Sequence, residues 1–259
     1  MNNPIKKVLL GEEPKLPLVT FVLIVILLAV FAAECMLGLD PTSRMVRPTV
    51  RTLVLMGGSS WYTTVGNQEW YRLVSAPFLH LDAPHLLFNL VVLYFAAAPL
   101  ERLLGQAWLL AIYTTTALGG STMSLATNAP HFLSIGASGA IMGLFAAGLI
   151  CTYRLPPGTD RTEMRTTALL MLIAGLAPAL LPQDLIAIIG LMDVAAHLGG
   201  ALSGAAVGAA IIAYWSGDKP MPEIEAGAKF VAATGIAAML GTATLIAGAY
   251  VQAWQAATH

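Results

Sequence analysis

Residues 134–144, Ser-Ile-Gly-Ala-Ser-Gly-Ala-Ile-Met-Gly-Leu, form the stretch around which the chain is organised. An uncharged loop turns here into an apolar helix, and Ser138 stands between glycines close to the turn. So short a motif occurs by chance in many chains. It therefore indicates a function only if the rest of the chain brings a partner to the serine. The helix that it opens runs to about residue 154 and belongs to a larger set of apolar segments.

The composition is that of a membrane protein. Of the 259 residues, 57% are hydrophobic and 10% are charged, and the mean hydropathy is +0.75. A soluble domain carries about 25% charged residues, so the apolar surface of this chain is expected to face a lipid bilayer. The net charge of −1 offers no basic surface for nucleic acid. Cys35 and Cys151 lie in or beside separate apolar runs, which argues against a disulfide framework.

Seven apolar segments are long enough, or nearly long enough, to cross a bilayer. They lack the alternating pattern of a membrane β-barrel, so we expect an all-α polytopic membrane protein. The first run is too long for the apolar part of a cleaved signal peptide and is expected to be retained as a helix. The expected spans are residues 17–38, 84–100, 106–126, 138–154, 166–182, 187–215 and 229–253.

The lysines and arginines of the connections predict the orientation, because cytoplasmic connections are enriched in them. If the N-terminus is inside, nine of the 13 lie on the inner side and four lie in the single long outer loop, residues 38–84. We therefore expect a cytoplasmic N-terminus and an external C-terminus, in a bacterial inner (plasma) membrane. The inner set is Lys6, Lys7, Lys15, Arg102, Arg154, Arg161, Arg165, Lys219 and Lys229, and the outer set is Arg44, Arg47, Arg51 and Arg72.

Four parts are expected along the chain. Residues 1–16 form a cytoplasmic N-terminal segment, and residues 17–215 form a six-span catalytic core. Residues 216–228 form a cytoplasmic linker, and residues 229–259 form a seventh transmembrane helix with an external tail. The long outer loop carries an aromatic set suited to the membrane interface, namely Trp61, Tyr62, Trp70, Tyr71 and Phe78.

Polar side chains inside membrane spans are costly, so the few that occur here are the candidates for function. Ser138 precedes Arg154 by 16 residues, and His197 precedes Trp215 by 18. At about 1.5 Å of rise per residue, these distances are roughly 24 Å and 27 Å from the inner boundary. The serine and the histidine are therefore expected at similar depths, below the outer surface.

Glycines allow the two helices that carry these residues to approach closely. Gly139 lies on the serine helix and Gly200 on the histidine helix, each within a small-xxx-small pattern. A serine hydroxyl needs a base to take its proton, and His197 is the candidate base. Donors for a developing oxyanion are expected from the Ser138 backbone N–H at a helix N-terminus and from His85 and Asn89. The latter two lie four residues apart on one helical face.

Two other chemistries were weighed. His80 and His85 do not form the His-Glu-x-x-His pattern of zinc proteases, and leucines rather than a carboxylate follow His85 at positions 86 and 87, so no metal site is expected. An aspartyl mechanism needs two intramembrane aspartates, and Asp193 is the one good candidate. Asp193 either orients His197, one turn further on, or lies at the outer helix end and favours the helix dipole.

The sequence strongly resembles the rhomboid family of intramembrane serine proteases over about residues 66–215. Four motifs carry the resemblance in order. They are Gln-Glu-Trp-Tyr-Arg at 68–72, His80-x4-His85-x3-Asn89, Gly-Ala-Ser-Gly at 136–139, and Asp-Val-Ala-Ala-His-Leu-Gly-Gly at 193–200 followed by Gly204.

The resemblance implies a six-helix rhomboid-like bundle plus one C-terminal transmembrane helix. It implies a Ser138–His197 dyad with no obligatory acid, and an oxyanion held by His85, Asn89 and the Ser138 amide. It makes His80 structural and Gly136 the strained turn before the serine, and it implies a structural role for Arg72 and Glu101. No cofactor is implied. The implied substrates are single-span membrane proteins, cleaved in or near the transmembrane segment.

The main alternative is a catalytically inactive rhomboid-like protein that binds membrane clients. Those relatives lack the serine or the histidine, whereas this chain keeps Ser138 and His197. A transporter or channel is the second alternative, and it would place polar residues through the depth of several spans. No oligomeric state is predicted.

Overall fold

The computed structural model describes residues 16–155, 158–180 and 192–215, with parts of the last apolar segment (229, 231–238, 241–242, 244–246 and 248). In these ranges the regular secondary structure is helical, and β pairing is confined to two isolated bridges. The all-α prediction is therefore confirmed. The expected segment 1–16 (but for its last residue), the linker 216–228 and much of 229–259 lie outside the described residues.

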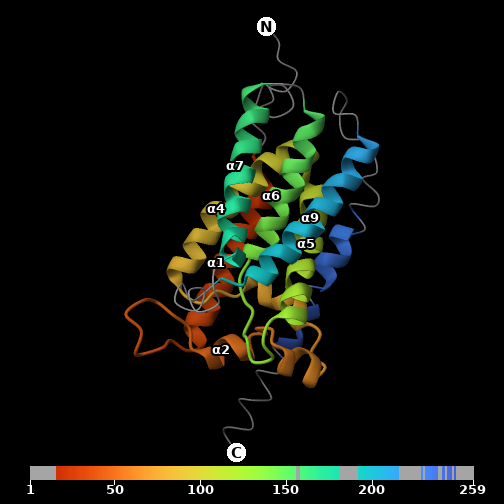
Figure 1. The fold of residues 1–259 in the computed structure, drawn as a ribbon. Helices are drawn as coiled ribbons and strands as arrows, with labels where there is room; N and C mark the ends of the chain where they lie inside the picture. Colours follow the sequence, from red (N-terminus) through yellow and green to blue (C-terminus); the bar gives the residue numbers. More distant parts are fainter. Residues whose placement is uncertain are drawn as a thin grey trace, which may run out of the picture.

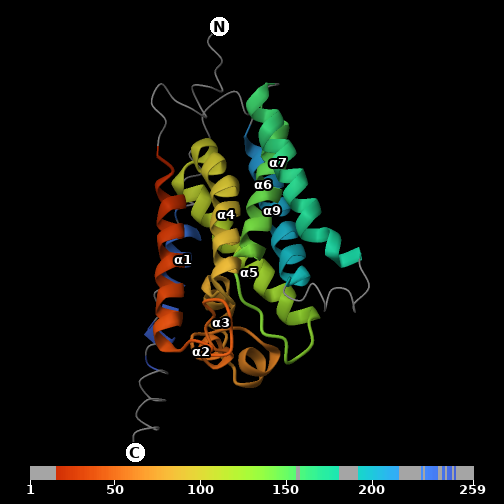
Figure 2. The same cartoon turned by 90° about the vertical axis from the view of Figure 1, so that its left-hand side faces the viewer.

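The long helices run side by side as a bundle, with the long loop and its short helices gathered at one end (Figures 1 and 2). The long helices are α1 (Leu18–Leu37), α4 (Ala83–Leu104), α5 (Gln106–Thr127), α6 (Ser138–Cys151), α7 (Thr159–Leu176) and α9 (Val194–Tyr214). The short ones are α2 (Val50–Leu55), the π-helix η2 (Tyr62–Gly66), α3 (Arg72–Ser75), and the 3-10 turns η3 (Ala76–Phe78), η4 (Thr152–Arg154) and η5 (Ala177–Leu180).

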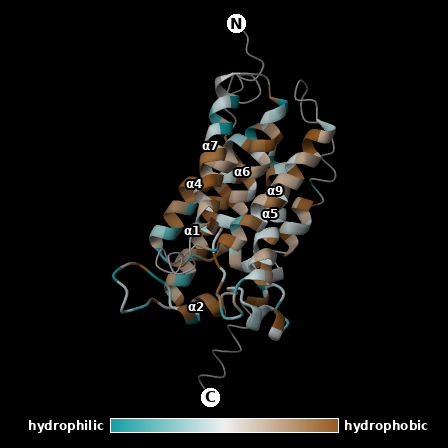
Figure 3. Cartoon of the chain, in the orientation of Figure 1, coloured by the Kyte–Doolittle hydropathy of each residue, from teal (hydrophilic) through white to brown (hydrophobic). Residues whose placement is uncertain are grey.

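Several helices are long and apolar enough to cross a membrane. In the described part of the chain four meet both conditions, namely Leu18–Leu37, Ala83–Leu104, Arg161–Leu180 and Val194–Tyr214, and Ser138–Arg154 is a shorter apolar helix. Hydrophobic residues dominate the middle of the bundle, and hydrophilic ones gather toward its ends (Figure 3). The chain is therefore an integral, multi-pass membrane protein.

Two helices begin where hydropathy did not place them. Helix α7 starts at Thr159 rather than near residue 166, because its first two turns carry charged residues that an apolar pattern does not include. Helix α9 starts at Val194 rather than near residue 187, because the Asp193 side chain accepts a hydrogen bond from the Ala196 N–H and caps the helix there.

Helix α6 occupies the centre of the bundle and contacts α4, α5, α7 and α9 (Figure 2). It is apolar on all sides and buried along most of its length, as expected for a helix enclosed by others. Its 14 residues span about 21 Å, which is less than the roughly 30 Å of a bilayer core. Its first residue, Ser138, can therefore lie inside the membrane profile rather than at its surface.

Helices α6 and α9 touch through glycines. A Cβ added to Gly200 would overlap the carbonyl oxygen of Gly139, and one added to Gly204 would overlap that of Gly143. No side chain larger than hydrogen fits at these crossings. This close approach is what small-xxx-small faces permit in membrane bundles.

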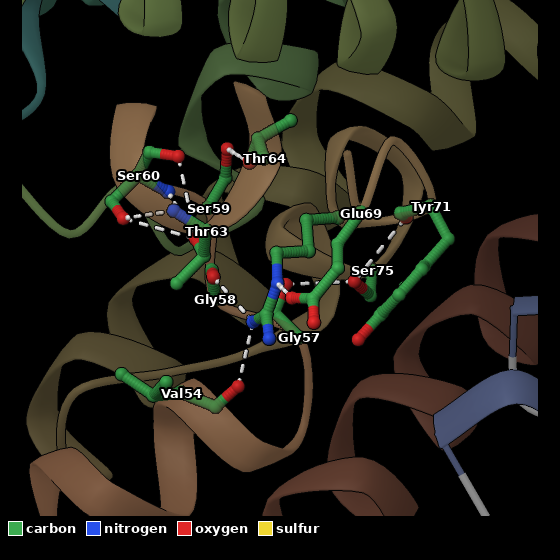
Figure 4. A network of polar contacts seen from close by, with 11 residues as sticks. Val54, Gly57, Gly58, Ser59, Ser60, Thr63, Thr64, Glu69, Tyr71 and Ser75 are labelled. Carbon is green, nitrogen blue, oxygen red and sulfur yellow. Dashed lines mark hydrogen bonds and ion pairs between the residues drawn. The ribbon is translucent and has the colours of Figure 1, made fainter. Parts of the chain in front are cut away.

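Two buried ionic side chains hold the ends of the bundle. The Glu101 carboxylate accepts hydrogen bonds from the Val19 and Thr20 N–H groups, both at 2.9 Å, and so caps α1 from α4. In the long loop, Arg72 donates to the carbonyl oxygens of Val54 at 2.6 Å and Gly58 at 2.8 Å, within the network of Figure 4. Both residues tie segments together, as the sequence resemblance implied.

Candidate active site

The loop that leads into α6 is anchored on both sides. Ser134 pairs with Ser59 of the long loop in both directions, with N···O distances of 2.8 and 3.1 Å, and the Gly136 N–H donates to the Ala76 carbonyl at 3.0 Å. Gly136 has a φ of +113°, a conformation that glycine adopts without the strain a side chain would bring. Ser138 follows as the first residue of α6.

His197 is buried on the first turn of α9, with 4% of its surface exposed. Its Nδ1 lies 2.8 Å from the carbonyl oxygen of Gly175 on α7. A carbonyl oxygen only accepts hydrogen bonds, so Nδ1 carries the proton in the neutral ring. The other ring nitrogen, Nε2, is then left with a free lone pair.

The Gly175 carbonyl oxygen can accept a hydrogen bond from His197 because α7 ends one residue later, at Leu176. The last four carbonyls of a helix have no partner within the helix. The Ala177 N–H bonds to Ile173, and Pro178 has no N–H to donate. The sequence carries a signal for this free carbonyl, a proline three residues after a glycine, which polar side chains alone do not reveal.

Ser138 and His197 are brought together by their neighbours. A Cβ on Gly139, the residue after the serine, would lie 3.0 Å from the carbonyl oxygen of Ala196, the residue before the histidine. A Cβ added to Gly175 would lie 2.5 Å from Met142 Sδ and 3.5 Å from His197 Nδ1. Met142 lies one turn after Ser138 on α6. The serine and the histidine therefore lie near the starts of two helices that pack against each other at this level of the bundle.

His85 faces the same point as the serine. A Cβ on Gly136 would lie 2.9 Å from His85 Cε1, 3.2 Å from its Nε2 and 4.0 Å from Ser138 Oγ. The Leu81 N–H donates to His85 Nδ1 at 3.5 Å, so Nδ1 acts as the acceptor and Nε2 carries the proton. His85 thus presents an N–H toward the space beside Ser138, with the opposite tautomer to that of His197.

Asn89 lies one turn after His85 on α4 and is buried, with 1% of its surface exposed. Its Nδ2 donates to the His85 carbonyl oxygen at 2.9 Å. A side-chain amide has two N–H groups, so one remains for another acceptor.

His80 is fully buried and packs its ring 5.2 Å from that of His85. Its backbone N–H donates to the Glu34 carboxylate of α1, and its Nδ1 lies 3.2 Å from the Phe78 carbonyl oxygen. Glu34 was not predicted as a site residue from the sequence; it ties the segment before α4 to α1. Within the described ranges no three His, Cys, Asp or Glu side chains gather as metal ligands.

Asp193 does more than cap α9. Its carboxylate accepts hydrogen bonds from the Ser124 and Ser134 hydroxyls, from Asn128 Nδ2 at 2.9 Å and from the Ala196 N–H at 3.0 Å. These donors come from α5, the serine loop and α9. With both oxygens engaged in this way, Asp193 joins the loop of Ser138 to the helix of His197 without bonding to the imidazole. These three side-chain partners of Asp193 were not predicted from the sequence.

Comparison with known proteins gives a consistent result. Residues 67–214 match the family described as "Rhomboid domain". The chain is 40% identical over 85 residues to "Putative rhomboid protease YdcA" of Bacillus subtilis (33% of this chain, 43% of the relative). It is 31% identical over 182 residues to "Rhomboid protease AarA" of Providencia stuartii (62% of each).

A third relative carries a different description. "Inactive RHOMBOID-like protein 8" of Arabidopsis thaliana is 34% identical over 107 residues (40% of this chain, 30% of the relative). The chain spans about half the length of the curated relatives it matches.

Proposed function

The chain belongs to the rhomboid family, and from this premise we propose that it is an intramembrane serine endopeptidase that uses Ser138 and His197. Two of the relatives described above are named as rhomboid proteases. No cofactor takes part in the proposed reaction.

The opposite tautomers of the two histidines carry the proposal. The Gly175 carbonyl holds the proton of His197 on Nδ1, which leaves Nε2 as a base. The Leu81 N–H bonds to His85 Nδ1, which leaves a proton on Nε2. Beside Ser138 there is thus one ring that accepts a proton and one that donates a hydrogen bond. Both are needed for attack on a peptide carbonyl.

In the first half of the proposed reaction, Ser138 Oγ forms a bond to the carbonyl carbon as its proton passes to His197 Nε2. The carbonyl oxygen becomes an oxyanion. It accepts hydrogen bonds from His85 Nε2–H, the remaining Asn89 N–H and the backbone N–H of Ser138, which is free of partners within its helix. The C–N bond then breaks, and His197 returns the proton to the leaving amine.

In the second half, water attacks the acyl-enzyme and His197 takes its proton. The bond between Ser138 Oγ and the acyl carbon breaks, the proton returns to Oγ, and a carboxylic acid is released. The same donors hold the second oxyanion.

The proposed substrates are single-span membrane proteins, cleaved in or near the membrane-spanning segment. The position of Ser138 at the start of the short central helix supports this, because a bond buried in a bilayer is reached at that depth. The proposed setting is a bacterial inner membrane with the N-terminus in the cytoplasm, which rests on the distribution of lysine and arginine.

The domain plan is also a proposal. It comprises the cytoplasmic segment 1–16, a six-span core over 17–215, the linker 216–228 and a seventh transmembrane helix with an external tail over 229–259. Residues 231–238 of the last part are helical, and a Cβ on Gly235 would meet Thr114 of α5. This contact supports packing of the seventh helix against the core.

The alternative is an inactive client-binding protein, since one relative is named inactive. The presence of Ser138, His197, His85 and Asn89 together favours the protease. An inactive protein has no use for a tautomer-controlled base beside a serine.

The test uses the purified full chain in liposomes with a panel of tagged single-span proteins. We expect cleavage by the wild type and none by Ser138→Ala or His197→Ala. Matched controls are Ser203→Ala and His131→Ala. Among the described residues, the Ser203 hydroxyl bonds to carbonyls of its own helix alone, and His131 lies in an exposed loop. Both should cleave at the wild-type rate. Wild-type cleavage by Ser138→Ala would refute the proposal, and binding without cleavage by the wild type would support the inactive alternative.

A further inference from the structure

A cavity lies away from Ser138, among α4, α6 and the first half of α7. It measures about 580 Å³, within the range of about 300–1,000 Å³ that ligand sites occupy. Phe95, Leu144, Phe145 and Ala168 form its inner, apolar part. The half-exposed Phe95 ring shows that this part opens toward the lipid-facing surface of the bundle.

The other end of the cavity is polar. Arg102 lies on the last turn of α4, and Thr162 and Glu163 lie on the first turns of α7, at the bundle end opposite the long loop (Figures 1 and 2). From Phe95 to Arg102 the helix rises by about 10 Å. The cavity is therefore amphipathic along the membrane normal, with an apolar part inside and charges at the boundary.

The two charged side chains at this end, Arg102 and Glu163, have no partner among the described residues. Within the described residues, no hydrogen bond or ion pair reaches the Arg102 guanidinium, and its Nε is buried without a partner. Glu163 also lacks an ion pair there, and the two side chains do not pair with each other. A buried donor left unsatisfied is costly, so a ligand that supplies an acceptor to Arg102 would be stabilised.

We propose that this cavity binds a phospholipid with a primary ammonium headgroup, such as phosphatidylethanolamine. The phosphate accepts hydrogen bonds from Arg102, whose planar guanidinium suits phosphate oxygens. The ammonium lies against Glu163, and an acyl chain lies along Phe95, Leu144 and Phe145. Basic pockets between membrane helices at the bilayer boundary are known to recognise lipid headgroups.

The acid in the cavity determines which headgroup fits best. A phosphatidylglycerol headgroup has the phosphate but no cation, and Glu163 would repel it. A phosphatidylethanolamine headgroup satisfies both charges. Selectivity between these two lipids therefore reports on Glu163, whereas overall affinity reports on Arg102.

The experiment is a titration of the delipidated full chain, in detergent, with short-chain phosphatidylethanolamine or phosphatidylglycerol, with bound lipid counted by native mass spectrometry. Arg102→Gln should weaken both lipids about tenfold or more, since it removes charge-assisted hydrogen bonds. Glu163→Gln should weaken phosphatidylethanolamine and strengthen phosphatidylglycerol. Arg161→Gln is the matched control, because it removes the same charge at the same end of the bundle, on the first turn of α7, but Arg161 does not line the cavity.

Each outcome decides the proposal. Equal lipid binding by the Arg102 and Arg161 variants would refute it, because bound lipid would then be a non-specific annulus. Equal affinity of the wild type for both lipids would also refute it and would favour another occupant, such as the inner half of a substrate helix. If Arg102→Gln fails to fold, Glu163→Gln tests the selectivity alone, since Glu163 is exposed and its substitution carries little folding risk.

Discussion

The hydrogen bond between His197 and the backbone of α7 can be weakened without changing any side chain. Replacing Leu176 by its α-hydroxy acid converts the peptide bond after Gly175 into an ester, and an ester carbonyl is a poorer acceptor than an amide carbonyl. The ring of His197 and its 2.8 Å contact to Gly175 would remain in place, but the bond that fixes the tautomer would weaken.

The size of the effect follows from the charge that develops on the ring. A neutral buried hydrogen bond contributes about 1 kcal/mol net, and a charge-assisted one is roughly twice as strong. His197 becomes an imidazolium as it takes the serine proton, so the transition state loses more than the ground state. The difference between these two losses, about 1 kcal/mol, lowers kcat by roughly 5-fold. KM should stay unchanged, because the substrate does not touch this bond.

The matched control is the same ester at Leu172, one turn earlier on α7. Both leucines are partly buried, and both esters remove one N–H from the helix. The two variants should therefore lose similar thermal stability, measured by melting in detergent. Steady-state cleavage gives kcat and KM for each variant. An equal loss of kcat in both variants, or no loss at Leu176, would show that the Gly175 carbonyl does not control the base.

Three further expectations follow. Gly200→Ala should lower the melting temperature and the activity together, because its Cβ overlaps the Gly139 carbonyl and overpacking costs about 1–3 kcal/mol. Gly241→Ala is the control and should be neutral, because it has open space around it. Equal melting temperatures of the two variants would contradict the packing argument. Asp193→Asn should destabilise the protein by about 2–4 kcal/mol, because an amide replaces one of two accepting oxygens of a buried carboxylate, and an unchanged melting curve would count against the role given to it. A reporter fused after His259 should be active only outside the cell, and cytoplasmic activity would mean that a span has been miscounted.

Much of the helix pattern could be predicted from the sequence, since several helix ends coincide with residues that break helices. Residues 17–38 were predicted and α1 spans Leu18–Leu37, with Pro17 before it and Gly38 after it. Residues 106–126 were predicted and α5 spans Gln106–Thr127, starting just after Gly105. At these places the apolar segment ends at the same residues as the helix, because a proline or glycine stands there.

The starts of α7 and α9 were not predictable in the same way. The first turns of α7 carry charges that an apolar window excludes, although the helix continues through them. The start of α9 depends on a side-chain cap by Asp193, and a single capping residue is only a weak signal within an apolar run. Helix ends that depend on tertiary structure or on one hydrogen bond are not visible in hydropathy.

The candidate site also contains some groups that the sequence identifies and others that it does not. Ser138, His197, His85 and Asn89 were identified because polar groups are conspicuous in apolar helices, and their assignment as catalytic groups remains a prediction. The Gly175 carbonyl was missed because every residue has a carbonyl, and only the fold shows which one reaches His197.

The polar groups around the serine loop have a common physical cause. Irregular backbone at membrane depth must find hydrogen-bond partners inside the protein, because lipid supplies none. The loop before α6 finds them in Ser59, in the Ala76 carbonyl and, through the Ser134 hydroxyl, in Asp193. The bonds that allow this loop to enter the bundle also fix where Ser138 begins its helix. We therefore expect that changes at Asp193 or Ser59 move the nucleophile as well as destabilise the loop, so kcat in the surviving folded fraction should fall with stability.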